Sequence, residues 1–364
     1  MHSSLTPVIL RELREPRAYP AVSLAMPTHR RPPENSQDPV RLGNLVSEAE
    51  RQLTADPGVT KERREDVVAQ LRAAVQEIDL AHVRDGLLVF AAPGEHQAWV
   101  VDRSVPERVV LADTFLTRNL VAADAARRPY WVLTLAADRI ALWDGRGERV
   151  TEDTGHGFPL TRGLEDPDAE RKERVGDLPS TFRDEQTRQF FRDADTALTE
   201  ALAGRPRRLY VTGESAALAL LADVGSVADT AIEVPVGGLA QATAEEVAQA
   251  VAPARQEAAR LVVAEALDQL EQARGERKYA AGVDEVWQEA QDGRIRRLVV
   301  EENYRITVRA GDGHLEPAAD DDIDAVHDIV DEVVESALET GAEVVFVPDD
   351  TLADAGRVAA VLRF

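Results

Sequence analysis

The sequence predicts an α/β fold made of three domains. The chain has 364 residues, and a typical domain contains roughly 100 to 200 residues, so two or three domains are expected. Short runs with β-strand character alternate with stretches of helical periodicity along the whole chain, which is typical of α/β folds. The apolar fraction of 44% is that of a globular protein. We place the three domains at residues 1–125, 126–259 and 260–364.

The first domain is predicted to be an α/β domain with a helical hairpin. Apolar runs between turn residues predict strands at residues 21–26, 87–91, 98–102 and 108–111. Two helices are expected at 40–53 and 61–78, because apolar residues recur there at helical spacing. The segment Ala-Asp-Pro-Gly at 55–58 is a turn between them. A polar loop, 28–39, precedes the first of these helices.

The middle domain is predicted to combine a mixed sheet with a long helix. Strands are expected at 130–135, 139–143, 209–212 and 232–236, and Asp144-Gly145 is interpreted as a tight hairpin turn. The long helix is expected at 183–203, followed by a short helix at 215–221. Thr243 and Glu246 form a capping-box pattern that predicts a helix from Ala244 to Ala273, with a break at Pro253. A polar stretch, 155–180, has no apolar period, and loops of this length are usually functional or disordered.

The third domain is predicted to be a small α/β sandwich. Helices are expected at 283–291 and 322–340, and strands at 297–300, 344–347 and 358–364. Gly311-Asp312-Gly313 marks a turn. Asp320, Asp321, Asp322 and Asp324 are interpreted as acidic residues that complement the dipole at a helix start, in preference to a cation site.

The composition restricts the function. The chain has no cysteine, which excludes disulfides and thiolate metal sites and agrees with a reducing cytoplasm, where we expect the protein. We expect no signal peptide and no membrane helix.

The net charge is -24. The first domain has 15 basic and 18 acidic residues, the second 16 and 23, and the third 11 and 25. Because nucleic-acid binding usually requires a basic face, general RNA binding and DNA binding are disfavoured. Any RNA contact is expected in the first two domains.

Eight segments carry a resemblance to a known superfamily, and they occur in order along the whole chain. They are AVSLAMP (21–27), DGLLVFAA (85–92), ADTFLTRNL (112–120), YWVLTLAADRIALWDG (130–145), RRLYVTGES (207–215), KYAAGVDEV (278–286), EVVFVPDD (343–350) and GRVAAVLRF (356–364). Each is similar to a core strand or turn of the class I release factor and Pelota superfamily. The segment MPTHR to QDPVRL, 26–42, further resembles the bacterial archaeo-eukaryotic release-factor-like families. The resemblance implies a three-domain translation factor.

Two functional motifs of the release factors are missing. In those proteins the N-terminal helical hairpin carries Asn-Ile-Lys-Ser, which meets the stop codon; we place the equivalent stretch at Gln37–Asn44, which lacks the motif. In the middle domain of a release factor, Gly-Gly-Gln enters the peptidyl transferase centre. The corresponding loop here, RKERVGDLPSTF at 171–182, has one glycine and no glutamine. The resemblance therefore does not extend to codon reading or peptidyl-tRNA hydrolysis by that mechanism.

Two groups of residues are candidates for RNA contact, because arginine pairs well with phosphate. In the first domain they are His29, Arg30, Arg31 and Arg41, and in the middle domain Arg171, Lys172, Arg174 and Gly176. The alternative for each group is a solvated charged segment with no ligand. We predict no catalytic residues, no metal site and no cofactor: the seven histidines show no metal-binding spacing, and no phosphate-binding glycine motif is present.

Three functions are consistent with these observations. The first is a non-catalytic ribosome-associated translation factor, acting in hibernation, rescue or quality control, which contacts rRNA or tRNA and has a translational GTPase as a further partner. The second is an enzyme that acts on RNA or peptidyl-tRNA through the stretch 155–180, since this stretch is long and charged. The third is an acidic scaffold that binds a protein through the third domain. The resemblance favours the first function.

Overall fold

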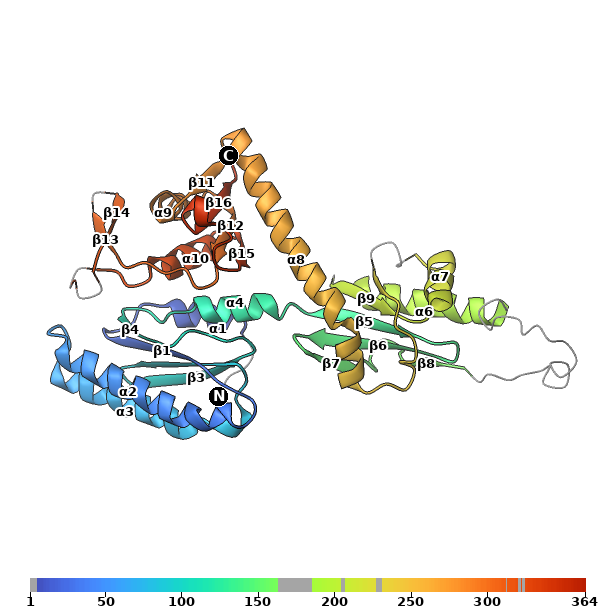
Figure 1. Ribbon diagram of the computed structural model, residues 1–364, viewed down its shortest axis with the longest axis horizontal. Helices are drawn as coiled ribbons and strands as arrows, with labels where there is room; N and C mark the ends of the chain where they lie inside the picture. Colours follow the sequence, from blue (N-terminus) through green and yellow to red (C-terminus); the bar gives the residue numbers. More distant parts are fainter. Residues whose placement is uncertain are drawn as a thin grey trace, which may run out of the picture. The chain divides into compact units, whose positions relative to one another are not determined.

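The computed structural model describes residues 5–162, 185–203, 207–226, 231–311, 313–319, 322 and 325–364. The chain divides into two compact units, of which one comprises Met1–Ala126 with Val263–Phe364 and the other Arg127–Val262. Both units combine sheets and helices, as Figure 1 shows, so the predicted α/β class is confirmed. The N-terminal and C-terminal segments, which are remote in sequence, belong to one unit.

The N-terminal segment is built on an antiparallel four-stranded sheet in the order β3-β2-β1-β4. Its strands are β1 (Ala21–Pro27), β2 (Gly86–Ala92), β3 (Glu95–Val101) and β4 (Arg108–Ala112). Alternate residues of β1 and β2 enter two separate cores, one on each face of the sheet. The hairpin helices α2 (Asp38–Ala55) and α3 (Lys61–Glu77) cover one face, and α1 (Pro7–Arg14) lies on the other with α4 (Arg118–Ala126) (Figure 1).

The structure corrects one placement within the helical hairpin. The turn between α2 and α3 is formed by residues 56–60, whereas Gln37–Asn44 lies at the opposite end of α2. The stretch compared above with the release-factor tip is therefore not the tip of this hairpin. Asp56 shapes the turn because its carboxylate accepts from Gly58 N at 2.7 Å and from the hydroxyl of Tyr19. Burial and this carboxylate raise the pKa of Tyr19 well above its usual range.

The middle unit contains a six-stranded mixed sheet. The order is β10-β9-β5-β6-β7, and β8 pairs with β6. The strands are β5 (Tyr130–Leu135), β6 (Arg139–Arg146), β7 (Arg149–Glu152), β8 (Leu160–Thr161), β9 (Arg208–Thr212) and β10 (Ile232–Val234). The helices α6 (Glu185–Ala203) and α7 (Ser215–Val224) pack on one face, and the start of α8 (Ala244–Glu276) packs on the other.

Two expectations for the middle unit were wrong in detail. Gly145 is not in a turn, since β6 continues to Arg146 and the chain reverses at Gly147 with φ 58°. Gly145 instead lies opposite Tyr130, whose ring occupies the space that a side chain would need. Helix α8 has no break at Pro253, which lies inside it. Buried residues lie on both sides of the proline, among them Val251 and Ala258.

The C-terminal segment adds a second four-stranded sheet to the first unit, in the order β11-β16-β12-β15. Its strands are β11 (Tyr279–Ala281), β12 (Ile295–Glu301), β15 (Glu343–Val347) and β16 (Val358–Leu362), with a separate hairpin of β13 (Val308–Gly311) and β14 (His314–Pro317). Helices α9 (Val283–Gln291) and α10 (Ile329–Glu339) pack against this sheet. No helix in the described ranges is long and apolar enough to span a membrane.

Helix α10 begins seven residues later than the periodicity predicts. It starts at Ile329, after Asp328, which has a left-handed backbone conformation with φ 63°. Asp322 therefore does not lie in the first turn of a helix, and its interpretation as a residue at a helix start is wrong. Asp322 pairs instead with Arg309 in β13. Asp320, Asp321 and Asp324 lie outside the described residues.

Candidate functional site

His29 and Arg41, two of the predicted RNA-contact residues, converge on one buried carboxylate. Asp38 at the start of α2 is 1% exposed. Its oxygens accept from His29 N at 2.8 Å and from Arg41 Nη1 at 2.9 Å, and the His29 ring Nδ1 lies 2.9 Å from Oδ1. Arg41 Nε is also 2.5 Å from a carboxylate oxygen of Glu107. These contacts anchor the loop after β1 to the first turn of α2.

The positive charge of Arg30 is also neutralised by acidic residues. Its guanidinium donates two parallel hydrogen bonds to Asp85, at 2.9 and 2.6 Å. It lies 3.9 Å from Asp102, which in turn accepts from Arg84 at 2.7 Å. Two-point pairing of this kind is among the stronger ion-pair geometries, and it occupies the edge of the guanidinium that would contact a phosphate.

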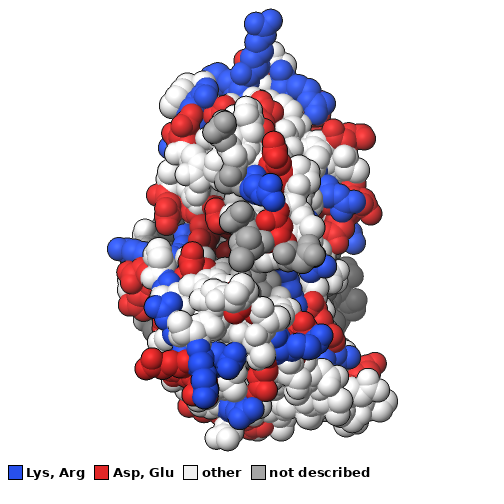
Figure 2. Space-filling model, turned by 90° about the vertical axis from the view of Figure 1, so that its left-hand side faces the viewer, with Lys and Arg blue, Asp and Glu red and all other residues white. Residues whose placement is uncertain are grey.

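Arg31 differs from its neighbours. Its side chain is exposed and forms no ion pair with any residue in the described ranges. On the face drawn in Figure 2, basic and acidic side chains are interspersed, without a large region of positive charge. The other candidates, Arg171, Lys172, Arg174 and Gly176, lie outside the described residues. Among the described residues, no group of three histidine, aspartate or glutamate side chains could hold a metal ion.

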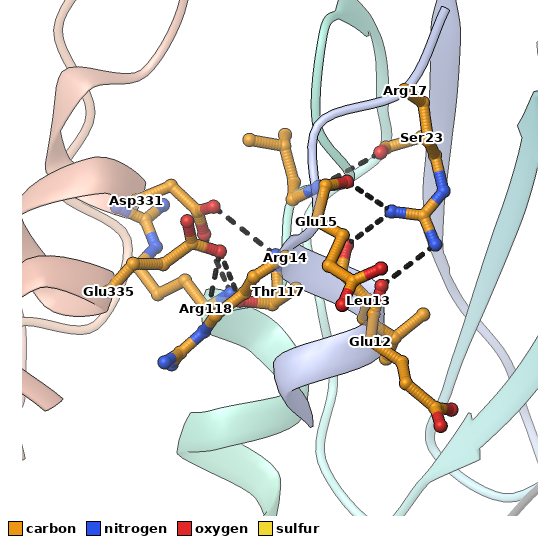
Figure 3. Close-up of polar contacts among 11 residues, drawn as sticks. Glu12, Leu13, Arg14, Glu15, Arg17, Ser23, Thr117, Arg118, Asp331 and Glu335 are labelled. Carbon is orange, nitrogen blue, oxygen red and sulfur yellow. Dashed lines mark hydrogen bonds and ion pairs between the residues drawn. The ribbon is translucent and has the colours of Figure 1, made fainter. Parts of the chain in front are cut away.

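Periodicity in the sequence does not indicate a largely buried polar cluster in the first unit. It joins α10 of the C-terminal segment to α4 of the N-terminal segment, as shown in Figure 3. The carboxylate of Asp331 accepts from the backbone N of Arg118 at 2.6 Å and of Thr117 at 3.3 Å. Glu335, one helical turn further along, accepts from the Thr117 hydroxyl at 2.8 Å and lies 3.6 Å from Arg14 Nε.

Further contacts surround this cluster. The guanidinium of Arg118 lies 3.3 Å from Asp328 and also donates to the carbonyl of Tyr304. Arg108 of β4 pairs with the same Asp328. In Figure 3, Arg17 lies against the end of α1 and donates to the carbonyls of Glu12, Leu13 and Glu15. It thereby fixes the last turn of the helix that carries Arg14.

The environment of the cluster raises the pKa of two carboxyl groups. Burial and the neighbouring Asp328 raise the pKa of Asp331 to about 6, against the opposing effects of Arg118 and of the two backbone donors. Burial and the charge of Asp331 raise the pKa of Glu335 to about 8, against the opposing effects of the Thr117 hydroxyl and Arg14. Burial and Asp331 therefore favour the neutral form of Glu335.

The family resemblance rests on the middle of the chain. Residues 129–294 match the model of bacterial archaeo-eukaryotic release factor family 3. The matched segment extends from the start of β5 to the end of α9. The resemblance predicted from the sequence is confirmed over this release-factor-like segment. No curated protein matches the chain.

Several solved structures are similar to the chain. Pelota of Archaeoglobus fulgidus is 18% identical, with 76% of this chain and 79% of that chain covered and a TM-score of 0.36. The archaeal translation termination factor aRF1 is 18% identical, with 98% and 96% covered and a TM-score of 0.25. Dom34 of S. cerevisiae, a translation termination-like factor, is 11% identical, with 76% and 80% covered and a TM-score of 0.41. At these values the likeness does not bear on function.

The release-factor-like segment includes residues 171–182, the loop that the resemblance predicted to correspond to the hydrolytic tripeptide of a release factor. Gly-Gly-Gln occurs nowhere in the 364 residues, and residues 171–182 contain the single glycine Gly176. Gly237-Gly238-Leu239 follows β10, and a side chain at Gly237 would meet Glu214 at 2.6 Å. This glycine is thus explained by close packing.

Proposed function

We propose that this protein is a non-catalytic translation factor that binds the ribosome. The observation that carries the proposal is the match of residues 129–294 to a release-factor family model. The missing Gly-Gly-Gln supports a role without peptidyl-tRNA hydrolysis, because residues 171–182 contain no glutamine to orient water. Ribosome hibernation, rescue or quality control are the roles that suit a factor without hydrolytic activity.

The charge distribution supports a limited RNA contact. His29, Arg30 and Arg41 are each compensated by carboxylates, so the exposed Arg31 is the member of this group best able to meet a phosphate. The basic residues at 171–174 are proposed as a second contact, and a translational GTPase as a further partner, both on the family resemblance alone. Since exposed charges are screened by salt, binding through these residues should weaken as ionic strength rises.

Co-sedimentation with ribosomes tests the proposal. Tagged full-length protein should migrate with ribosomal particles in sucrose gradients from growing or starved cells. Replacement of Arg171, Lys172 and Arg174 together by Gln should move it toward the ribosome-free fractions, whereas the control R11Q, at another exposed arginine, should not. Confinement of the wild-type protein to ribosome-free fractions in both growth states would refute the proposal. Release of peptide from peptidyl-tRNA by the purified protein would favour the enzymatic alternative.

A further inference from the structure

The carboxylates of α10 and the residue before it lie on one side of the helix. Asp331 and Glu335 are four residues apart on α10, which places their side chains on one side of the helix, and Asp328 directly precedes it. All three face groups of the N-terminal segment that are more than 200 residues away in sequence. The row therefore connects the two parts of the first unit, independently of the middle unit.

Asp331 supplies the cap of a helix to which it does not belong. Helix α4 begins at Arg118, and the first backbone N–H groups of a helix have no partner within the helix. Here the N–H groups of Thr117 and Arg118 donate to Asp331, whose negative charge also complements the helix dipole. A residue from the C-terminal segment thus performs the role that a local Ser, Thr or Asp usually has.

Separation of the two segments would expose several buried groups or leave them without a partner. Asp331 and Asp328 are 3% and 2% exposed, and the Arg118 side chain is 6% exposed. Around these charges, Val121 of α4 and Leu10 of α1 pack into the core of the C-terminal segment. Breaking a buried ion pair on one side leaves an uncompensated charge, so intermediate arrangements are unfavourable and the contact is either closed or open.

We propose that the Asp328–Asp331–Glu335 row is a latch that fastens the C-terminal segment to the N-terminal segment by capping α4, and that opening the latch frays the start of this helix. Helix α4 has only nine residues, and isolated helices of this length are marginal in water. Its first turn therefore depends on the cap and on the packing that the cap holds in place. The proposal does not rest on the proposed function.

The protonation state of Glu335 affects the latch. The charged groups around Glu335 are Arg14 of α1 and Asp331 and Glu332 of α10. The neighbouring Asp328 and Asp331 face Arg108 of β4 and Arg118 of α4, with Tyr304 beside Asp328. Because the pKa of Glu335 is raised in the folded protein, the stability linked to this group is complete below its unfolded value and is lost as the pH rises through about 8. The latch is accordingly weaker in mildly alkaline solution.

Hydrogen exchange of the full-length protein, followed by mass spectrometry, tests the latch. In D331A, peptides covering residues 115–126 should exchange about tenfold faster than in the wild type, the equivalent of about 1.4 kcal/mol. D331N should lie between the two, since an amide retains one acceptor. Peptides from β1 and β2, which lie away from α10, should be unchanged. The control is E339Q, an exposed glutamate of the same helix.

A second variant decides the question if D331A does not fold. Gln at position 335 resembles a protonated glutamate, so E335Q should remove the pH dependence. Between about pH 7 and pH 9, above the titration of Asp331, protection of residues 115–126, corrected for intrinsic exchange, should fall in the wild type and stay constant in E335Q. Equal pH responses in the two proteins would overturn the proposal. So would unchanged exchange of α4 in D331A, or equal acceleration in α4 and in β1.

Discussion

Replacement of Asp38 by alanine should loosen the loop that follows β1. The carboxylate is buried and accepts one hydrogen bond from His29 N and one from Arg41, at 2.8 and 2.9 Å, with the His29 ring nitrogen also within 2.9 Å. A hydrogen bond to a charged group contributes about 1.5 to 3 kcal/mol. His29 and Arg41 are partly exposed and Arg41 retains Glu107, so water can compensate part of the loss. We expect the free energy of unfolding of the N-terminal segment to fall by about 2 to 4 kcal/mol.

The measurement must report on the N-terminal segment alone, because a chain with two compact units need not unfold in one step. Hydrogen exchange in increasing urea, read from peptides that cover β1 and β2, gives a midpoint for this segment. The matched control is E107Q, which removes a half-exposed partner of the same arginine and should cost less than about 1 kcal/mol. If D38A shifts the midpoint no more than E107Q, the reasoning that Asp38 anchors the loop is wrong.

Three further outcomes are expected. G145A should lower the thermal midpoint of the middle unit, because the new methyl group would overlap the Tyr130 ring, and we expect a cost of about 1 to 3 kcal/mol in calorimetry. T243A should remove the cap that donates to and accepts from Glu246, costing about 0.5 to 2 kcal/mol, and faster exchange at the start of α8 would show it. R31E should reduce ribosome co-sedimentation at low salt, with little effect at high salt; equal binding of R31E and wild type would exclude Arg31 as a contact.

The features that were predicted correctly from the sequence depend on residues close to one another along the chain. The capping box at Thr243 and Glu246 is present, with Thr243 N donating to Glu246 at 2.7 Å. The hairpin helices and most core strands begin and end within a few residues of their predicted limits, because the apolar period and the turn residues specify them locally. Trp131 and Trp143, interpreted as residues of a strand, are both buried.

The errors share a different cause. Helices α1 and α4 are short and were not predicted, and the helix predicted from residue 322 begins only at Ile329. In α4 the hydroxyl of Thr117, the residue before the helix, donates to Glu335, and Asp331 accepts from the first backbone N–H groups. Gly145 has the composition of a turn, but the ring of Tyr130 on the neighbouring strand explains it. For α4 and Gly145 the deciding partner lies on another element of the fold.

The candidate site shows the same division. The sequence identified the basic residues after β1 as possible phosphate ligands, on residue type alone. Only the fold brings Asp85 and Asp102 to Arg30, and thereby reduces the positive charge available for RNA. The buried latch could not be predicted, since its two sides are more than 200 residues apart and its carboxylates resemble ordinary helix surface residues.

By itself, the sequence determined the α/β class, most core strands, the resemblance to release factors and the absence of Gly-Gly-Gln, because each of these depends on residue type and on periodicity over a few neighbours. The tertiary structure decided that the N-terminal and C-terminal segments form one unit and which charges are neutralised within it. The physical reason is that the free energy of a charged group depends on its burial and on the charges a few ångströms away, and those neighbours are specified only when the chain has folded.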